Sequence, residues 1–281
     1  MRARVQADAT AAYIARHFKD KIAAVYSSDL CRASETARRI AAALSLPTLT
    51  TPAFRETGLG VLEGLTEVEM REKHDATIEK WRSNHALPIP GGESAVQRYY
   101  RTILSITELC CLHPGEHIVV VTHGGVLDDF ARMSKGLPFG RGTETRKLNA
   151  GINIIAHHFD ASSLRTVTAE HVRAEAAALR AAHAATPAGT VAPSPHGAGV
   201  IAAAIKSALP FEGLDAAAAS AHLAVHPRAT GKYSFANTGV VDASIAAGGA
   251  APAPAAGSGA APEVIAEAED SDDETDLVSS L

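Results

Sequence analysis

The sequence predicts an α/β fold, a three-layer α/β/α sandwich with a mainly parallel sheet. Apolar runs alternate with segments of helical periodicity from about Ala7 to about Ala182. One of these runs, HIVVVTHGG, is continuously apolar and bounded by turn residues, which is typical of a buried strand. Strands that alternate with helices form parallel sheets covered on both faces. The order of the elements therefore indicates the fold class.

The first elements follow from residue spacing. Ala11, Ile14 and Phe18 recur at helical spacing, so the basic N-terminal segment is interpreted as an amphipathic helix rather than a mitochondrial transit peptide. KIAAVYSS is a short apolar strand that ends in polar residues near Ser27. The run DLCRASETARRIAAALSL predicts a helix, and LTT predicts a second short strand before a loop that contains glycines.

The later elements begin with a long helix. Ser94 is a candidate N-cap, and one helical face is then marked by Val96, Tyr99, Ile103, Ile106 and Cys110. HIVVVTHGG predicts the next strand, and a helix runs through Val126 to Met133. Two strand-like runs, GINIIAHHF and LRTVTAE, complete the block.

The composition changes after about His183, where Ala, Pro, Gly and Ser dominate. Such segments bury too little apolar surface to offset chain entropy. We therefore predict one domain at residues 1–182 and a largely low-complexity extension at residues 183–281, with VIAAAIKSALPFEGL and KYSFANTGVVDASI as candidates for local structure or docking. The end, EAEDSDDETD, is interpreted as a solvated acidic tail, and phosphorylation of Ser271 and Thr275 is the alternative.

Charge and cysteine content narrow the class of protein. The net charge of the 281 residues is −5, which does not indicate a nucleic-acid surface. Three cysteines, two of them adjacent, make no disulfide framework and suit a reducing compartment. No apolar run is long enough to cross a bilayer. We predict a cytoplasmic protein; the final Ser-Ser-Leu is only a weak match to the peroxisomal Ser-Lys-Leu signal.

Three residues carry groups suited to phosphoryl transfer. Ligands of open parallel sheets bind at the carboxyl ends of strands, where Arg32 follows KIAAVYSS and His123 ends HIVVVTH. The arginine fork matches phosphate oxygens, and a histidine stabilises charge on them. Glu56, in the loop between the two strands, can protonate a leaving oxygen if its pKa is raised. Gly124 lets the backbone of a helix N-terminus approach an anion.

Each residue alone more often has a structural role, and several neighbours allow alternatives. Ser27 and Ser28 are candidate nucleophiles, but no base is placed beside them in the sequence, and a strand-end turn is favoured. His157 and His158 are adjacent on a predicted strand and so point to opposite faces, which disfavours a metal pair. We predict no metal site and no cofactor.

The ordered motifs YSSDLCRASETA, FRETGLGVLEG, PGGES and VVVTHGG resemble those of the histidine phosphatase superfamily, the phosphoglycerate mutase-like fold. KLNAGINII is similar to a late strand of that family, and the resemblance extends from about Met1 to about Glu170. It implies that Arg32 binds the phosphoryl group, that Glu56 is the proton donor, and that His123 completes the phosphate pocket. The family pattern gives Glu63 a structural role.

The resemblance also implies a nucleophilic histidine in an Arg-His-Gly motif at the end of a first strand. The sequence has no such motif before YSSDLCRA, and Arg16-His17 is followed by Phe18 inside a predicted helix. We therefore expect the domain to be incomplete at its N-terminus, with its first strand missing; the alternative is a truncated, inactive protein. Either GVIAAAIKSAL or KYSFANTGVV is a conceivable donor for the missing strand.

The function implied by the resemblance is hydrolysis of a phosphomonoester through a phosphohistidine, with a phosphorylated small molecule as substrate. A phosphoglycerate mutase and an inactive phosphate-binding pseudoenzyme are the alternatives. The interval between Glu56 and His123 resembles that of the compact phosphatases. The segment from Glu67 to Ile89 is a candidate for specificity; its basic residues and Trp81 are otherwise a solvated face and a packing anchor.

Overall fold

A computed structural model describes residues 2–135, 137, 149–157, 168–197, 199–208 and 233–237. The helices are α1 Arg2–Phe18, α2 Cys31–Leu44, α3 Glu67–Ser83, α4 Ala95–Leu112, α5 Gly124–Lys135, α6 Ala169–Ala185 and α7 Val200–Ala208. The strands are β1 Ile22–Ser28, β2 Thr48–Thr51, β3 His117–Val121, β4 Asn153–His157, β5 Val191–Pro193 and β6 Tyr233–Asn237. Short 3₁₀ turns are η1 Lys19–Lys21, η2 Pro52–Phe54 and η3 Gly60–Leu62.

The predicted parallel sheet is confirmed. Four strands lie in the order β3-β1-β2-β5, and every neighbouring pair is parallel. β1 is the longest of these strands, and its last five residues are buried. β4 and β6 form a separate antiparallel pair. The carboxyl ends of β1 and β3 are in register, with Ser27 opposite Val121, so the segments that follow them leave the sheet side by side.

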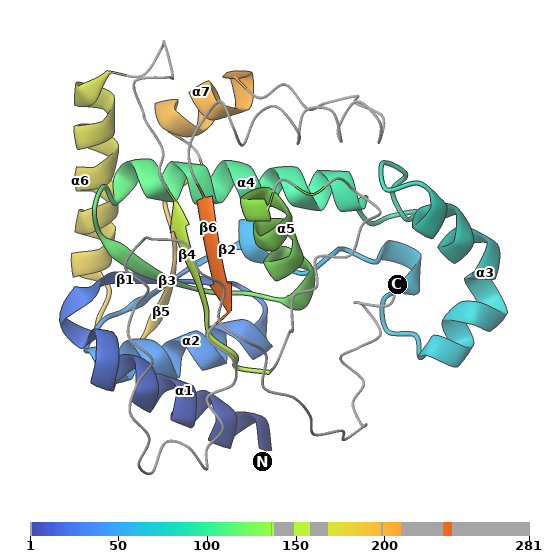
Figure 1. Ribbon diagram of the computed structural model, residues 1–281, viewed down its shortest axis with the longest axis horizontal. Coiled ribbons are helices and arrows are strands. Elements are labelled where there is room, and N and C mark those ends of the chain that lie inside the picture. The colour runs from blue at the N-terminus through green and yellow to red at the C-terminus, as the bar shows by residue number, and fades with distance from the viewer. Residues whose placement is uncertain are drawn as a thin grey trace.

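Helices cover both faces of the sheet, which confirms the three-layer architecture (Figure 1). Alternating side chains of β1 point to opposite faces. Val25 packs in a cluster with residues of α1 and α2, including Ile14 and Ile40. Tyr26 packs in a second cluster with residues of α4, including Tyr99 and Ile103. Apolar side chains of β3 contribute to both clusters, as expected for a strand between two helical layers.

The long helix α4 begins at the predicted cap. The Ser94 hydroxyl accepts a hydrogen bond from the amide of Gln97, whose side chain accepts one from the Ser94 amide. This reciprocal pair is a capping box and satisfies amides that the first helical turn leaves free. The cap fixes the residue at which α4 begins, and Arg98 and Arg101 follow in the first two turns of the helix.

Segments beyond residue 182 also lie against the domain. α6 ends at Ala185, β5 adds to the edge of β2, and Ile201 of α7 is fully buried in the cluster that contains Tyr26. The candidate run GVIAAAIKSAL therefore supplies a helix, so its prediction as a donor strand is wrong. KYSFANTGVV supplies β6, which pairs with β4. The domain boundary at residue 182 stays a prediction.

Two further expectations need correction or lie outside the described residues. LRTVTAE was predicted as a strand, but Ala169 and Glu170 begin α6, because the Thr168 hydroxyl caps the helix by accepting a hydrogen bond from the His171 amide. Residues 164–167, Ser271, Thr275 and the C-terminal tripeptide lie outside the described residues. Among the described strands, β3 pairs only with β1, and its residues Ile118 to Val121 are partly buried.

Candidate active site

Arg32 and His123 meet at the carboxyl edge of the sheet. Arg32 lies in the first turn of α2, which follows β1, and His123 lies between β3 and α5. Because β1 and β3 are parallel neighbours, these two helices begin close together. The Arg32 Nε donates a hydrogen bond to His123 Nδ1 at 3.2 Å. The structure therefore brings together the two residues that the sequence places at neighbouring strand ends.

This contact fixes which nitrogen of His123 carries the proton. An arginine only donates, so Nδ1 must accept, and the proton of a neutral imidazole lies on Nε2. Burial, together with the charge of Arg32, lowers the pKa of His123 to about 4, so the ring is neutral at pH 7. The Nε2 atom is buried and has no hydrogen-bond partner among the described residues. His123 thus presents an unused N–H donor beside the guanidinium of Arg32.

Glu56 reaches the same place from the loop after η2. Its Oε1 accepts hydrogen bonds from the amide of Thr57 at 2.8 Å and from the Thr57 hydroxyl at 3.3 Å. Its Oε2 accepts one from the amide of Gly125, in the first turn of α5, at 3.0 Å. The carboxylate is therefore tied to the helix that begins next to His123.

The raised pKa expected for Glu56 is wrong for this state of the protein. Burial alone would raise it, but the charge of Arg98 and the amide hydrogen bonds from Gly125 and Thr57 outweigh burial and lower the pKa. Glu56 is therefore a carboxylate at neutral pH in the structure. As a proton donor, it would first have to gain its proton when an anionic group binds nearby.

The sequence interpretation missed the buried ion pair between Arg98 and Asp129. The Arg98 Nε and Nη2 donate to the two carboxylate oxygens of Asp129 at 2.8 and 3.0 Å. The third nitrogen, Nη1, donates to the Thr57 hydroxyl at 2.6 Å. Asp129 is completely buried. The two helices were predicted, but no pattern in the sequence indicates that these two positions face each other.

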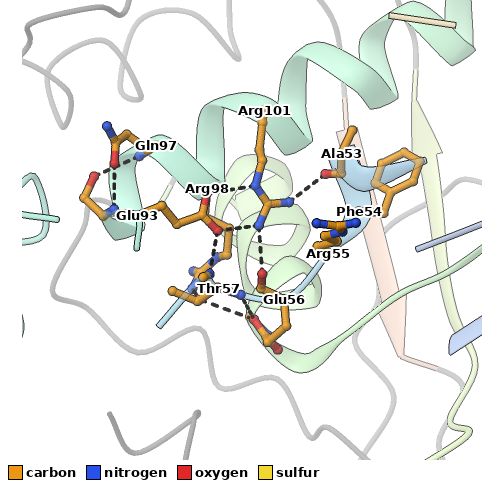
Figure 2. Close-up of polar contacts among 12 residues, drawn as sticks. Ala53, Phe54, Arg55, Glu56, Thr57, Glu93, Gln97, Arg98 and Arg101 are labelled. Atoms are coloured by element: carbon orange, nitrogen blue, oxygen red, sulfur yellow. Dashed lines mark hydrogen bonds and ion pairs between the residues drawn. The ribbon is translucent and has the colours of Figure 1, made fainter. Parts of the chain in front are cut away.

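A second missed pair supports the loop that carries Glu56 (Figure 2). Arg101 binds both carboxylate oxygens of Glu93, at 2.9 and 2.5 Å. It also donates to the carbonyl oxygens of Ala53 at 2.8 Å and Glu56 at 3.1 Å. Glu93 in turn accepts the amide of Gly58 at 3.0 Å. The motifs FRETGLGVLEG and PGGES contain Glu56, Gly58 and Glu93 of this network, but Arg101 lies outside both.

The rim of the site carries a further ion pair that the sequence interpretation did not name. Asp29, directly after β1, accepts two hydrogen bonds from Arg55, each of 2.6 Å. The hydrogen bonds from Arg55 lower the pKa of Asp29, although burial opposes them. The charge of Asp29 acts on His123 in the direction opposite to that of Arg32. Acidic and basic groups therefore both face His123.

Several alternative sites can now be assessed. Ser27 and Ser28 are fully buried; the Ser27 hydroxyl donates to the Ser28 carbonyl, and the Ser28 hydroxyl accepts the amide of Leu30, so the strand-end turn is confirmed. Glu63 is exposed at the end of η3. His158 and the side chain of His157 lie outside the description. Within the described ranges, no three His, Cys, Asp or Glu side chains converge to hold a metal ion.

The segment from Glu67 to Ile89 contains α3. Trp81 packs with Leu62, Met70, Ile78 and Ile89, which confirms its interpretation as a packing anchor. Arg71 and Lys73 form surface ion pairs with acidic residues of the same helix, one turn away. None of the helices within the described residues has the length and apolarity that a membrane span requires. A role of this segment in specificity stays a prediction.

Comparisons with known proteins agree with the family resemblance and the fold. The sequence profile of the histidine phosphatase superfamily (branch 1) matches residues 2–170. Phosphoglycerate mutase-like protein 4 of Arabidopsis thaliana is 37% identical over 139 residues, which cover 48% of this chain and 59% of that protein. The metal-independent phosphoserine phosphatase of the same species is 36% identical over 141 residues, which cover 49% of this chain and 57% of that protein.

A solved structure named mycobacterial hydrolase 2 matches with a TM-score of 0.50 and 25% identity, over 63% of this chain and 84% of that one. The chain spans less than three fifths of the length of the two Arabidopsis relatives. The matched profile covers more than half of the chain, including β1 to β4 and the site residues. The chain belongs to the histidine phosphatase superfamily, branch 1.

Proposed function

We propose that the protein is a phosphomonoester hydrolase and that Arg32, His123 and Gly124 bind the phosphoryl group. The observation that carries the proposal is the pair of donors at the strand ends, the Arg32 guanidinium and the buried His123 Nε2–H. Apart from the bond that Nε donates to His123, the Arg32 guanidinium forms no hydrogen bond or ion pair with other described residues, so its terminal nitrogens are available to phosphate oxygens. Gly124 opens α5, whose first amides face the same region.

In the proposed reaction, a histidine attacks phosphorus, the bond to the ester oxygen breaks, and Glu56 gives that oxygen its proton. Water then attacks the phosphohistidine and passes a proton to the Glu56 carboxylate, which releases inorganic phosphate and restores both groups. His123 is unsuited to be the attacking residue, because the lone pair on Nδ1 accepts from Arg32 and Nε2 carries the proton. Its role is to donate to the phosphoryl oxygens as charge develops.

The proposed hydrolysis needs a nucleophilic histidine, and none is assigned in this chain. The printed sequence contains no Arg-His-Gly motif, so the attacking histidine stays unassigned. A phosphate-binding protein without turnover is therefore the second candidate function. The name of one relative, a metal-independent phosphoserine phosphatase, supports hydrolysis without a metal. That of another, a phosphoglycerate mutase-like protein, keeps transfer to a second hydroxyl as an alternative.

The test is to measure binding and turnover separately on the full chain. Binding of inorganic phosphate is followed by calorimetry, and hydrolysis by release of p-nitrophenol from p-nitrophenyl phosphate. Arg32→Ala should weaken phosphate binding at least about tenfold, the loss expected for a charge-assisted contact. Arg38→Ala is the matched control, since Arg38 lies on the same helix and pairs with Glu35 at the surface.

The two readouts separate the candidates. Binding with turnover that His123→Ala abolishes supports the hydrolase. Binding that depends on Arg32 without turnover supports the phosphate-binding protein. Absence of phosphate binding, or binding that Arg32→Ala leaves unchanged, would contradict the site itself. A phosphorylated small molecule as substrate and a cytoplasmic location remain proposals from the sequence.

A further inference from the structure

The Thr57 hydroxyl links two charged groups that do not contact each other directly by hydrogen bonds in the structure. It lies 2.6 Å from Arg98 Nη1 and 3.3 Å from Glu56 Oε1. A guanidinium has no lone pair to offer, so the hydroxyl must accept from Arg98. Its single proton is then free to point towards the Glu56 carboxylate. The hydrogen-bond chain therefore has one direction, from Arg98 through Thr57 to Glu56.

Arg98 is itself fixed. Its other two nitrogens bind both oxygens of Asp129 in a bidentate arrangement, and Asp129 is completely buried. Burial opposes the charge of Arg98, but Asp129, with smaller contributions from Glu56 and Glu93, more than offsets burial and raises the pKa of Arg98. The arginine is therefore permanently charged and has little freedom to move.

Helix α5 contacts both Arg98 and Glu56. Asp129 and Gly125 lie on α5, one turn apart, and the Gly125 amide donates to Glu56 Oε2. A Cβ at residue 125 would lie 2.4 Å from Glu56 Oε1 and 2.9 Å from Arg98 Nη1. A glycine is thus needed for carboxylate and guanidinium to approach this helix together.

We propose that Arg98, clamped by Asp129, is a positioning residue that holds the Glu56 carboxylate against α5 through the Thr57 hydroxyl. This inference rests on the proposed function, in which Glu56 transfers the proton. In the free protein the clamp keeps Glu56 ionised and oriented. A bound phosphoryl dianion disfavours that charge, so Glu56 takes up a proton when the substrate binds.

The experiment follows the titration of Glu56 by ¹³C NMR of side-chain carboxyl-labelled glutamate in the full chain, with Glu56→Gln for assignment. Thr57→Val is close in shape and removes the hydroxyl, whereas Thr57→Ser keeps it. We expect Glu56 in Thr57→Val to bind its proton about tenfold more tightly than in the wild type. In Thr57→Ser the proton affinity should stay within about twofold of the wild type.

A second variant removes both charges of the clamp together. Arg98→Met combined with Asp129→Asn should also strengthen proton binding by Glu56, by about tenfold or more. Wild-type titration of Glu56 in Thr57→Val or in this double variant would overturn the proposal. Titration of the same samples with inorganic phosphate separates the proposed function from the role of the clamp. If the wild type does not bind phosphate, the proposed function is contradicted, but the titration of Glu56 can still be measured and compared among the variants.

Discussion

Two glutamates, the half-buried Glu56 and the buried Glu108, have pKa values shifted in opposite directions, although burial raises the pKa of both. Glu56 lies at the candidate active site, and Glu108 lies on α4 where the segment after β5 crosses it. Glu56 accepts two backbone amides, from Gly125 and Thr57, and Glu108 accepts one, from Gly197. The pKa of Glu56 is nevertheless lowered, whereas burial raises the pKa of Glu108 to about 7.

The two pKa shifts differ in direction partly because the nearest charged groups have opposite signs. Glu56 lies near Arg98, whereas the carboxylate of Glu175 lies near Glu108 and adds to the effect of burial. One amide hydrogen bond does not offset burial at Glu108, whereas the charge of Arg98 together with two amide hydrogen bonds does so at Glu56. The ion pair of Arg98 with Asp129 therefore lies beside Glu56, which is ionised at neutral pH, and has no counterpart beside Glu108 in the causes of its pKa shift. The same comparison shows that burial of a carboxyl group does not by itself mark a functional site.

The largest expected effect comes from breaking the clamp. Asp129→Ala leaves the Arg98 charge buried without its partner, so the free energy of unfolding should fall by about 3–5 kcal/mol. Chemical denaturation of the full chain measures this loss. Arg98→Met with Asp129→Asn, which removes both charges of the pair, should recover much of it. An Asp129→Ala variant as stable as the wild type would contradict the role given to the clamp.

The second effect concerns Glu108 and depends on pH. The pKa of Glu108 is raised on folding, so the stabilisation it provides is complete below about pH 4.5 and is lost as pH rises to about 7. Glu108→Gln keeps an acceptor for Gly197 and removes the titration. Its free energy of unfolding, relative to the wild type, should increase by roughly 2–3 kcal/mol between pH 4.5 and pH 8.

Denaturation curves at several pH values test this prediction. Glu63→Gln is the matched control, because Glu63 is an exposed glutamate on a loop. A difference between Glu108→Gln and the wild type that stays constant over this pH range would show that Glu108 is not titrating on folding.

The smallest effect sharpens the comparison between the two acids. In Gly125→Ala the new Cβ displaces the free end of the Glu56 side chain and crowds the clamped Arg98 guanidinium. We expect the fold to survive because the atoms that it meets belong to side-chain ends and not to backbone. Glu56 should lose the Gly125 hydrogen bond and bind its proton roughly three- to tenfold more tightly. Glu108, observed in the same ¹³C spectra, serves as the internal control and should not change. Equal changes at both glutamates would indicate a general loosening of the fold instead.

Much of the fold could be predicted because local sequence patterns indicate the strands and helices. The apolar runs around Val25 and Val120 and the cap at Ser94 are each visible within a few residues. The meeting of Arg32 and His123 also follows, because neighbouring parallel strands end at the same edge. The start of α6 was missed where strand-like residues run directly into the Thr168 cap.

The rest depends on contacts between distant positions. Arg98 and Asp129 meet only because α4 and α5 pack with particular rotations, and no local pattern records that. The sign of the Glu56 pKa depends on that pair, so the expected raised pKa was wrong for the same reason. The docking of α7 through Ile201 was similarly left open, because the surrounding composition is typical of unstructured segments.

Arg32 and the Nε2–H of His123 form the proposed phosphate-binding pair, and ¹⁵N NMR of histidine-labelled full chain tests whether they do. We expect a neutral His123 ring at pH 7 with its proton on Nε2. We also expect the Nε2 resonance to shift to saturation as inorganic phosphate is added, and Arg32→Ala to abolish the shift. A proton on Nδ1 in the free protein, or a resonance that phosphate does not move, would contradict the proposed pair.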